Sequence, residues 1–251
     1  MLSTIARYTI LESLRNRMSF TALFFFIVSF FIAEFVGSLV LTEAVFFQTT
    51  LLSSMMRTVS VFVLSLFVIS SCLKERQDRQ LELLLSLPLH RYQYLLGKIT
   101  GFFVMAFLLS FFLSWPILVY GYWQGSLIWF ISLLLELMIC ASFCFFLVFT
   151  FQHLVPALTA FFIFYLLSRS MSAIQNLAEN PLDIISSADQ FMILIIKGIN
   201  FLLPNLDHFC QSIWLVSYPE FSILLPLLSE AFLYICLINL ATLIDFYRKN
   251  L

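Results

Sequence analysis

Long apolar runs separated by short polar stretches dominate the sequence. Residues 19–41, 58–73, 95–120, 126–151 and 221–246 form five of these runs, and a sixth follows a short turn at His153 and Pro156 and continues to about 167. A helix needs about 20 apolar residues to cross the roughly 30 Å hydrocarbon core of a bilayer. The run 58–73 reaches this length when it is extended backwards through Leu51 and Leu52. The pattern therefore predicts six transmembrane helices.

The segments outside these runs are amphipathic. Residues 3–17 place four apolar residues on one helical face and three charged residues largely elsewhere: Ile5, Tyr8, Leu11 and Leu14 against Arg7, Glu12 and Arg15. This spacing predicts an N-terminal helix within residues 1–18 that lies in the membrane interface. Residues 172–220 are too many for a turn and too apolar for a flexible loop, so they are expected to form short external helices in or on the outer leaflet.

Composition supports a membrane class. Of 251 residues, 62% are hydrophobic and 11% are charged, whereas soluble domains carry roughly 25% charged residues. The apolar runs are unbroken, unlike the alternating ten-residue strands of a membrane barrel. The fold class expected is therefore an all-α polytopic membrane protein, with residues 1–251 as one transmembrane domain. A nucleic-acid partner is not expected, because no basic cluster with interleaved aromatic residues lies outside the membrane flanks.

The distribution of basic residues predicts the orientation. Ten of the 13 Lys and Arg residues lie in the N-terminal segment, in the stretch 74–98 and at the C-terminus. Since cytoplasmic flanks are enriched in Lys and Arg, both termini and the loop 74–94 are expected to be cytoplasmic. The opposite side then holds only Arg57, Arg169 and Lys197.

The stretch 74–98, "KERQDRQLELLLSLPLHRYQYLLGK", carries five basic and three acidic residues. Anchoring a loop in the cytoplasm requires only the basic ones. The part "QLELLLSLP" predicts a short amphipathic helix with Leu81, Leu84 and Leu85 on one side and a stop at Pro88. Apolar residues that fill a groove, with charges around them that set orientation, are what a docking element for a cytoplasmic partner needs.

This stretch resembles the cytoplasmic loop of ABC-2 type ABC transporter permeases, whose coupling helix sits in a cleft on a separate ATPase subunit. Glu75 and Arg76 resemble the start of the family pattern, and Gly97 and Lys98 resemble its end at the third span. The family often has Gly-Thr where this chain has Arg79 and Gln80. The resemblance implies docking of the ATPase on Glu75, Arg76, Leu81, Glu82, Leu84, Leu85, Pro88 and Arg91.

The resemblance further implies a permease subunit, not itself an enzyme, that works in the bacterial inner membrane. It implies a homodimer with two copies of the ATPase, which hold the ATP and Mg and drive export, and no cofactor in this chain. The P-loop pattern G-x-x-x-x-G-K-[ST] is absent, since "LLGKIT" lacks the upstream glycine at the required spacing. Membrane lipid is an expected partner, and a periplasmic or envelope partner and the identity of the substrate stay open.

Carboxylates inside predicted spans are costly and are therefore candidate functional residues. Glu34, Glu136 and Glu230 are candidates for translocation or gating, with an inter-helix hydrogen bond as the structural alternative. Arg169 is the nearest plausible basic partner. If these carboxylates carry the function, the chain is instead an ion- or proton-coupled secondary transporter. No catalytic or metal site is expected, because Cys140 and Cys144 have no nearby His or third Cys.

Overall fold

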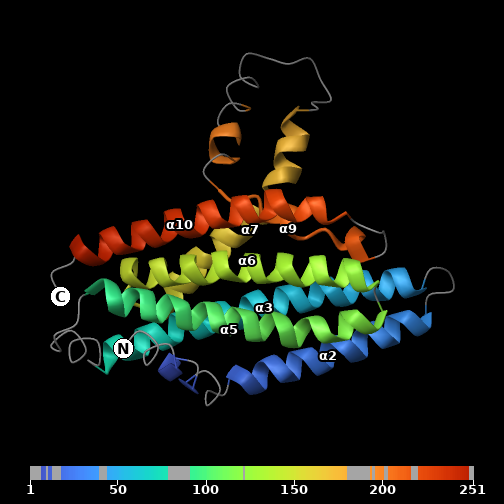
Figure 1. Ribbon diagram of the computed structural model, residues 1–251, viewed down its shortest axis with the longest axis horizontal. Coiled ribbons are helices and arrows are strands. Elements are labelled where there is room, and N and C mark those ends of the chain that lie inside the picture. The colour runs from blue at the N-terminus through green and yellow to red at the C-terminus, as the bar shows by residue number, and fades with distance from the viewer. Residues whose placement is uncertain are drawn as a thin grey trace.

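The chain folds into a bundle of long helices (Figure 1). The computed structural model describes residues 7–9, 11–12, 18–39, 44–78, 91–120, 122–179, 193, 196–200, 203–215 and 220–248. The core of the expected coupling helix, from Leu81 to Pro88, lies outside the described residues. Among the residues described, the secondary structure is helical and contains no strand.

The long helices correspond to the predicted spans. They are α2 (Met18–Leu39), α3 (Ala44–Gln77), α5 (Arg91–Tyr120), α6 (Trp123–Thr150), α7 (Leu154–Glu179) and α10 (Leu224–Arg248). Five of them, α3, α5, α6, α7 and α10, are long and apolar enough to cross a membrane, which confirms an all-helical chain with several candidate spans. The described apolar part of α2, Leu23–Leu39, is shorter.

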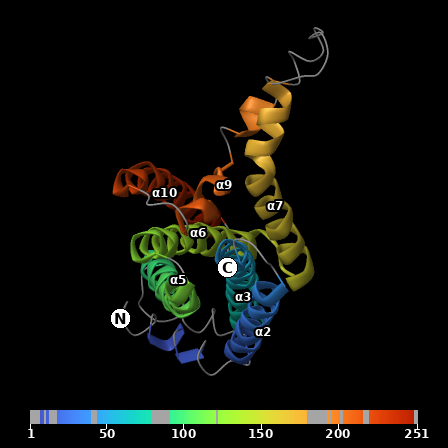
Figure 2. The ribbon, with the colours of Figure 1, turned by 90° about the vertical axis from the view of Figure 1, so that its right-hand side faces the viewer.

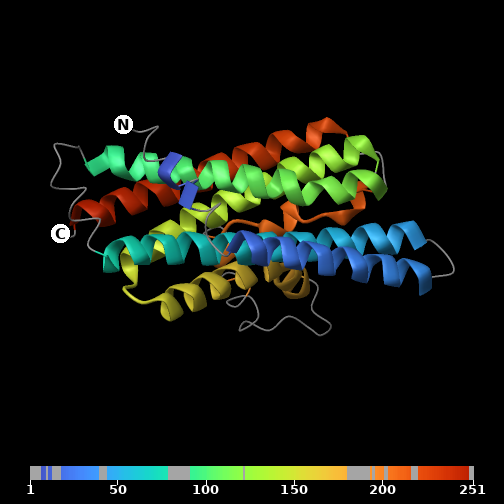
Figure 3. The same ribbon diagram turned by 90° about the horizontal axis from the view of Figure 1, so that it is seen from below.

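Helix α6 lies at the centre of the bundle. It packs against α3, α5, α7 and α10, while α2 packs along α3. Figure 2 shows α2, α3, α5 and α6 nearly end-on and α7 from the side, so α7 crosses the common direction. The end of the bundle where α3 ends and α5 begins is called the loop end, and the opposite end is called the far end. Helix α10 ends at Arg248, and the C-terminal end of this helix lies at the loop end (Figures 1 and 3).

Helix α3 begins at Ala44, earlier than the predicted start at residue 58 and earlier than the backward extension to Leu51. Polar residues interrupt the apolar run between 48 and 60, but all of their hydroxyl groups except that of Thr50 bond to carbonyl oxygens of their own helix. Thr49 donates to Val45 at 2.9 Å, and Ser60 donates to the carbonyl of Arg57 at 2.7 Å. Such bonds satisfy a buried hydroxyl without any partner outside the helix. The helix therefore continues through this stretch to a length of 34 residues.

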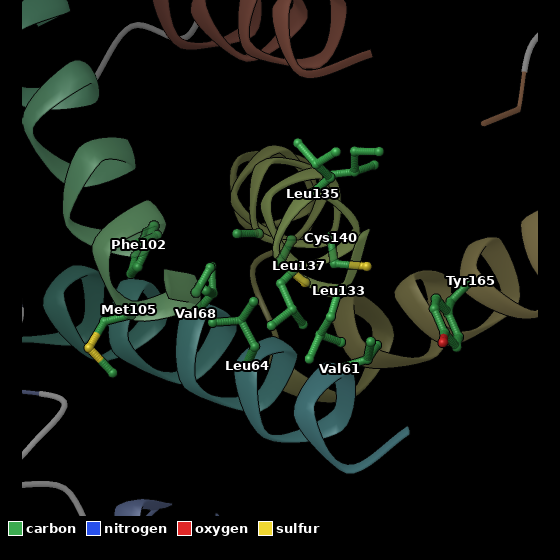
Figure 4. Close-up of a cluster of buried hydrophobic side chains, with 14 of the residues drawn as sticks. Val61, Leu64, Val68, Phe102, Met105, Leu133, Leu135, Leu137, Cys140 and Tyr165 are labelled. Atoms are coloured by element: carbon green, nitrogen blue, oxygen red, sulfur yellow. The ribbon is translucent and has the colours of Figure 1, made fainter. Parts of the chain in front are cut away.

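The core lies between α3, α5 and α6. Figure 4 shows Leu64 and Val68 of α3 turned toward Leu133 and Leu137 of α6, and all four side chains are fully buried. The same helices also bring their aromatic residues together, as Phe102 of α5 packs edge-to-face on the rings of α3 and α6. This close packing fixes α3, α5 and α6 relative to one another, and with them the polar side chains that these helices carry.

The N-terminal helix is present in residues 7–9 and 11–12. Tyr8 and Leu11 are 56% and 65% exposed, so these two apolar side chains point away from the bundle. The expected position of this helix in the membrane interface stays a prediction. Thr9 is buried against α5, where an added Cβ on Gly101 would come within 2.9 Å of the Thr9 Cβ. The helix thus packs through its polar face.

The region 172–220 differs in part from the prediction. Residues 172–179 are the last turns of α7, and short helices follow: α9 (Leu206–Phe209), η1 (Ser212–Leu215) and η2 (Phe221–Ile223). Figure 2 shows α9 between α7 and α10, above α6. Residues 203–215, called the wedge segment below, therefore fill the space between two long helices instead of lying apart from the bundle.

Gly125 allows the wedge segment to touch the backbone of α6. A Cβ on Gly125 would lie 2.0 Å from the carbonyl oxygen of Trp214. We expect Gly125→Ala to displace η1 and to lower the free energy of unfolding by about 1–3 kcal/mol, the usual range for overpacking. Gly198→Ala is the matched control, since nothing lies within 4 Å of its added Cβ. Equal thermal stability of the two variants in detergent would show that η1 does not press on α6.

Candidate functional site

The loop end contains a buried lysine, Lys98 of α5, which is 1% exposed. Its Nζ lies 2.5 Å from Glu75 Oε1 on α3 and 3.8 Å from Glu12 Oε2 on the N-terminal helix. The Tyr94 hydroxyl donates to Glu75 Oε2 at 2.9 Å, and the Ser71 hydroxyl donates to Glu12 Oε2 at 3.0 Å. These five residues are called the loop-end cluster.

The loop-end cluster joins three elements of the chain. A buried ammonium group is tolerated when carboxylates and hydrogen bonds compensate its lost hydration. Here that compensation comes from α3 and from the N-terminal helix, while the lysine belongs to α5. Glu75 lies in the last turn of α3 before the loop, and Lys98 lies about two turns inside α5 after it. The pair therefore ties together the two helices that flank the loop.

Glu75 and Arg76, two of the expected docking residues, have partners inside the bundle. Glu75 is 6% exposed and bonds to Lys98. Arg76 Nη1 donates to the carbonyl oxygen of Val148 at 3.3 Å, and its guanidinium lies 6.0 Å from the Phe149 ring centroid. Both residues thus hold the end of α3 against α5 and α6, and their expected contact with a partner stays a prediction. Arg91 is the first residue of α5.

A second buried group of charges lies in the middle of the bundle. Arg57 of α3 forms an ion pair with Glu136 of α6, and the two side chains are 2% and 0% exposed. Arg57 also donates to the Ser132 hydroxyl at 3.1 Å and lies 5.2 Å from the Trp129 ring centroid. The Tyr165 hydroxyl of α7 donates to Glu136 Oε1 at 3.0 Å. These five residues are called the mid-bundle cluster.

Two expectations about this cluster are wrong. Arg57 does not lie in a flank of the second span, because α3 extends 13 residues beyond it toward the far end. Arg169 is not the basic partner of Glu136, because Arg57 occupies that position and Arg169 bonds to the Tyr165 hydroxyl at 3.0 Å. One signal was present in the sequence: Thr49, Ser53, Arg57 and Ser60 follow at spacings that place them on one helical face.

The wedge segment reaches the mid-bundle cluster through Cys210. The Cys210 sulfur lies 3.8 Å from both carboxylate oxygens of Glu136, which is the midpoint residue of α6. Burial, followed by the nearby Glu136 carboxylate, raises the pKa of Cys210 to about 12. The thiol is thus protonated at neutral pH and can donate to Glu136. The carbonyl of Trp214 meets Gly125, so the wedge segment runs along α6 for about 16 Å.

Helices α7 and α10 hold the wedge segment on its two sides. On α7, Ser172 donates to Asp207 Oδ2 at 2.5 Å. On α10, Glu230 Oε1 accepts from the backbone N–H of Asn205 at 3.1 Å, and Oε2 lies 3.9 Å from His208 Nδ1. The candidate Glu230 therefore anchors the wedge segment to α10.

The structure separates the three candidate carboxylates. Glu136 is central to the mid-bundle cluster and Glu230 holds the wedge segment. Glu34 has an exposed side chain on α2, which contributes no residue to either cluster. Among the described residues, no three His, Cys, Asp or Glu side chains are placed to hold a metal ion together. Cys140 and Cys144 are buried core residues.

Long apolar helices around a buried ion pair define a polytopic membrane protein. The model of the ABC-2 family transporter proteins matches residues 42–197, which include α3, the following loop, α5, α6 and α7. The chain belongs to this ABC-2 transporter family, a family of membrane transport subunits. No curated protein matches the sequence.

Proposed function

We propose that the chain is the membrane subunit of an ABC-2 type exporter, driven by a separate ATPase that docks on the loop between α3 and α5. The family match carries this proposal, because it spans this loop and the helices on both sides. We further propose a homodimer with two ATPase copies, in a bacterial inner membrane. The 22 residues of α2, about 33 Å long, complete six spans.

The proposed orientation places the loop end in the cytoplasm. Most Lys and Arg residues belong to the segments at this end, and basic residues favour the cytoplasmic side. The wedge segment then lies on the external side. Leu81, Glu82, Leu84, Leu85, Pro88 and Arg91 are proposed as the docking residues. Glu75 and Arg76 are assigned a supporting role within the bundle.

The loop-end cluster offers a physical route for the coupling. Because Glu75 and Lys98 are paired, motion of the loop moves α3 and α5 together. Helix α3 then continues without a break to Arg57, about 27 Å further along its axis. Arg57 holds Glu136, and Glu136 contacts Cys210 of the wedge segment. We propose that displacement of α3 weakens these contacts and releases the wedge segment, so that Glu136 acts in gating.

The ion-coupled alternative required carboxylates that could take up and release an ion. The negative charge of Glu136 is instead balanced by its ion pair with Arg57 and by a hydrogen bond from Tyr165. Glu230 accepts a backbone hydrogen bond. Paired, structurally engaged carboxylates favour the conformational role over ion coupling.

The docking proposal is tested by affinity purification of the chain from its native membrane. We expect an ATP-hydrolysing subunit to co-purify at a near-equimolar ratio, and Glu82→Lys and Leu84→Asp to remove most of it because they disrupt the charged and apolar contacts of the docking helix. Glu220→Lys is the matched control, since Glu220 is an exposed far-end carboxylate. If both loop variants retain the ATPase at the control level with normal hydrolysis, the docking role is wrong. If no ATPase co-purifies even with the unaltered chain, the proposal that a separate ATPase drives this subunit is wrong.

A further inference from the structure

Helix α7 contacts two inner carboxylates through neutral hydroxyl groups, and an arginine lies between these two contacts. The Tyr165 hydroxyl donates to Glu136 Oε1 at 3.0 Å. The Ser172 hydroxyl donates to Asp207 Oδ2 at 2.5 Å. Arg169 lies four residues after Tyr165 and three before Ser172, so the three side chains share one helical face. Its Nη1 donates to the Tyr165 hydroxyl at 3.0 Å, so the guanidinium lies at the depth of Glu136, in the middle of the bundle.

The charge of Arg169 has no direct counter-ion in the part of the chain that the structure describes. No carboxylate lies within 4.0 Å of it there, and Glu136 is already paired with Arg57. A charged group at this depth is costly and is by default a candidate for substrate binding. The five N–H donors of a guanidinium match a carboxylate, and the hydrogen bond to Tyr165 occupies only one of them.

Asp207 is the carboxylate of the wedge segment that lies nearby. Among the described residues it has no Lys, Arg or His within 4.0 Å either, and it accepts from Ser172, one turn of α7 beyond Arg169. Both charges reach the same thiol. Burial is the largest influence on the pKa of Cys210, but the charge of Arg169 also lowers this pKa and the charge of Asp207 raises it. The two opposite charges are therefore neighbours without a direct bond.

The wedge segment fills this space with short pieces of helix, four residues in α9 and four in η1. Non-helical backbone at membrane depth is stable only where protein buries it or where it lines a cavity. Interrupted helices near the midplane are also where secondary transporters bind their substrates. Leu206 and Phe209, on the two sides of Asp207 in the sequence, are 0% exposed. The space that the segment fills therefore accepts one carboxylate with apolar groups beside it.

We propose that Arg169 binds the carboxylate of the exported substrate, an apolar acid, and that Asp207 holds this place while the wedge segment is closed. The inference rests on the proposed function, since it requires release of the wedge segment. When the segment leaves, Asp207 leaves with it, and Arg169 loses its nearby opposite charge. A substrate carboxylate restores the balance, and the apolar part of the substrate covers the surfaces that Leu206 and Phe209 contacted. Substrate and wedge segment thus exclude each other.

Binding is measured on the purified full chain in phosphatidylcholine nanodiscs, without any ATPase. Radiolabelled hydrocinnamate is the probe, because it carries one carboxylate and one apolar ring. We expect saturable binding above that of empty nanodiscs. Arg169→Gln should weaken it about tenfold, the effect of losing one charge-assisted contact. Arg248→Gln is the matched control, because Arg248 is an exposed arginine at the end of α10, and it should bind the probe as the unaltered chain does.

Asp207→Asn should change binding in the opposite direction. The amide oxygen can still accept from Ser172, but the charge that competes for Arg169 is gone. The open form is then more populated, so hydrocinnamate should bind several-fold more tightly. A carboxylate with a merely structural role would not raise the affinity when it is replaced. Glu220→Gln is the matched control, because Glu220 is an exposed carboxylate outside the wedge segment, and it should leave the affinity unchanged.

The proposal is overturned if Arg169→Gln binds hydrocinnamate like the unaltered chain, if Arg248→Gln weakens binding equally, or if Asp207→Asn does not bind more tightly. Absence of saturable binding to both the unaltered chain and Asp207→Asn overturns it as well. Equal competition by the neutral hydrocinnamide would show that the carboxylate is not recognised, and equal competition by inorganic phosphate would show a site for any anion. The proposed function is judged separately by the co-purifying ATPase, so either proposal can fail while the other stands.

Discussion

Arg57→Met is expected to lower the free energy of unfolding by about 3–5 kcal/mol, the usual cost of removing one partner of a buried ion pair. Glu136 is 0% exposed and would remain as a buried carboxylate without its ion-pair partner, with Tyr165 and Cys210 as its neutral hydrogen-bond donors. The loss is measured by equilibrium unfolding of the purified chain in mixed micelles with increasing denaturing detergent.

The double variant Arg57→Met, Glu136→Leu distinguishes the effect of the ion pair on stability from its effect on transport. Replacing both members of a buried pair by apolar residues is often neutral or stabilising, so this variant should regain most of the stability. Transport should nevertheless be lost, because the contact from α3 through Glu136 to Cys210 is gone. Ser132→Ala serves as the control and should cost only about 1 kcal/mol, as it removes a single neutral partner of Arg57. A stable Arg57→Met variant would mean that the pair is not formed in the membrane.

Lys98→Met is expected to have the second large effect, a loss of about 3 kcal/mol or more, because Glu75 would remain buried without its cation. The N-terminal helix should also detach more readily, since the Glu12 contact with Lys98 is lost. Both effects are measured by unfolding and by protease cleavage between the N-terminal helix and α2.

Lys74→Met provides the comparison for this prediction. Lys74 lies in the last turn of α3 beside the same loop, but its side chain is exposed. Its replacement should change the unfolding free energy by less than about 0.5 kcal/mol, as is usual at the surface. Indistinguishable stabilities of the Lys98 and Lys74 variants would contradict the assignment of Lys98 as the buried centre of the loop-end cluster.

Hydropathy alone predicted the helical class and most of the long helices, since an apolar run of the right length has few other stable structures in a membrane. It failed at the start of α3, where buried hydroxyl groups lower the hydropathy without breaking the helix. Thr49 and Ser53 are 2% and 1% exposed, although their residue types suggest a polar flank.

The polar contacts were harder to foresee because they join distant parts of the chain. Arg57 and Glu136 are 79 positions apart, and Cys210 and Glu136 are 74 apart. No local pattern specifies such pairs, since they depend on how α3, α6 and the wedge segment pack. Glu75 and Lys98 were visible in the loop pattern, but only the packing of α3 against α5 shows that they bond to each other.

The central claim is that motion of the loop between α3 and α5 releases the wedge segment. The reactivity of Cys210 tests this claim most directly. The other four cysteines are replaced by alanine, and the complex with its ATPase is treated with a membrane-impermeant alkylating reagent. With the wedge segment in place, the raised pKa of Cys210, about 12, leaves very little reactive thiolate. Release of the segment should restore an ordinary thiol, so alkylation should be much faster during ATP hydrolysis than without ATP. An alkylation rate that is the same with and without ATP would contradict the account.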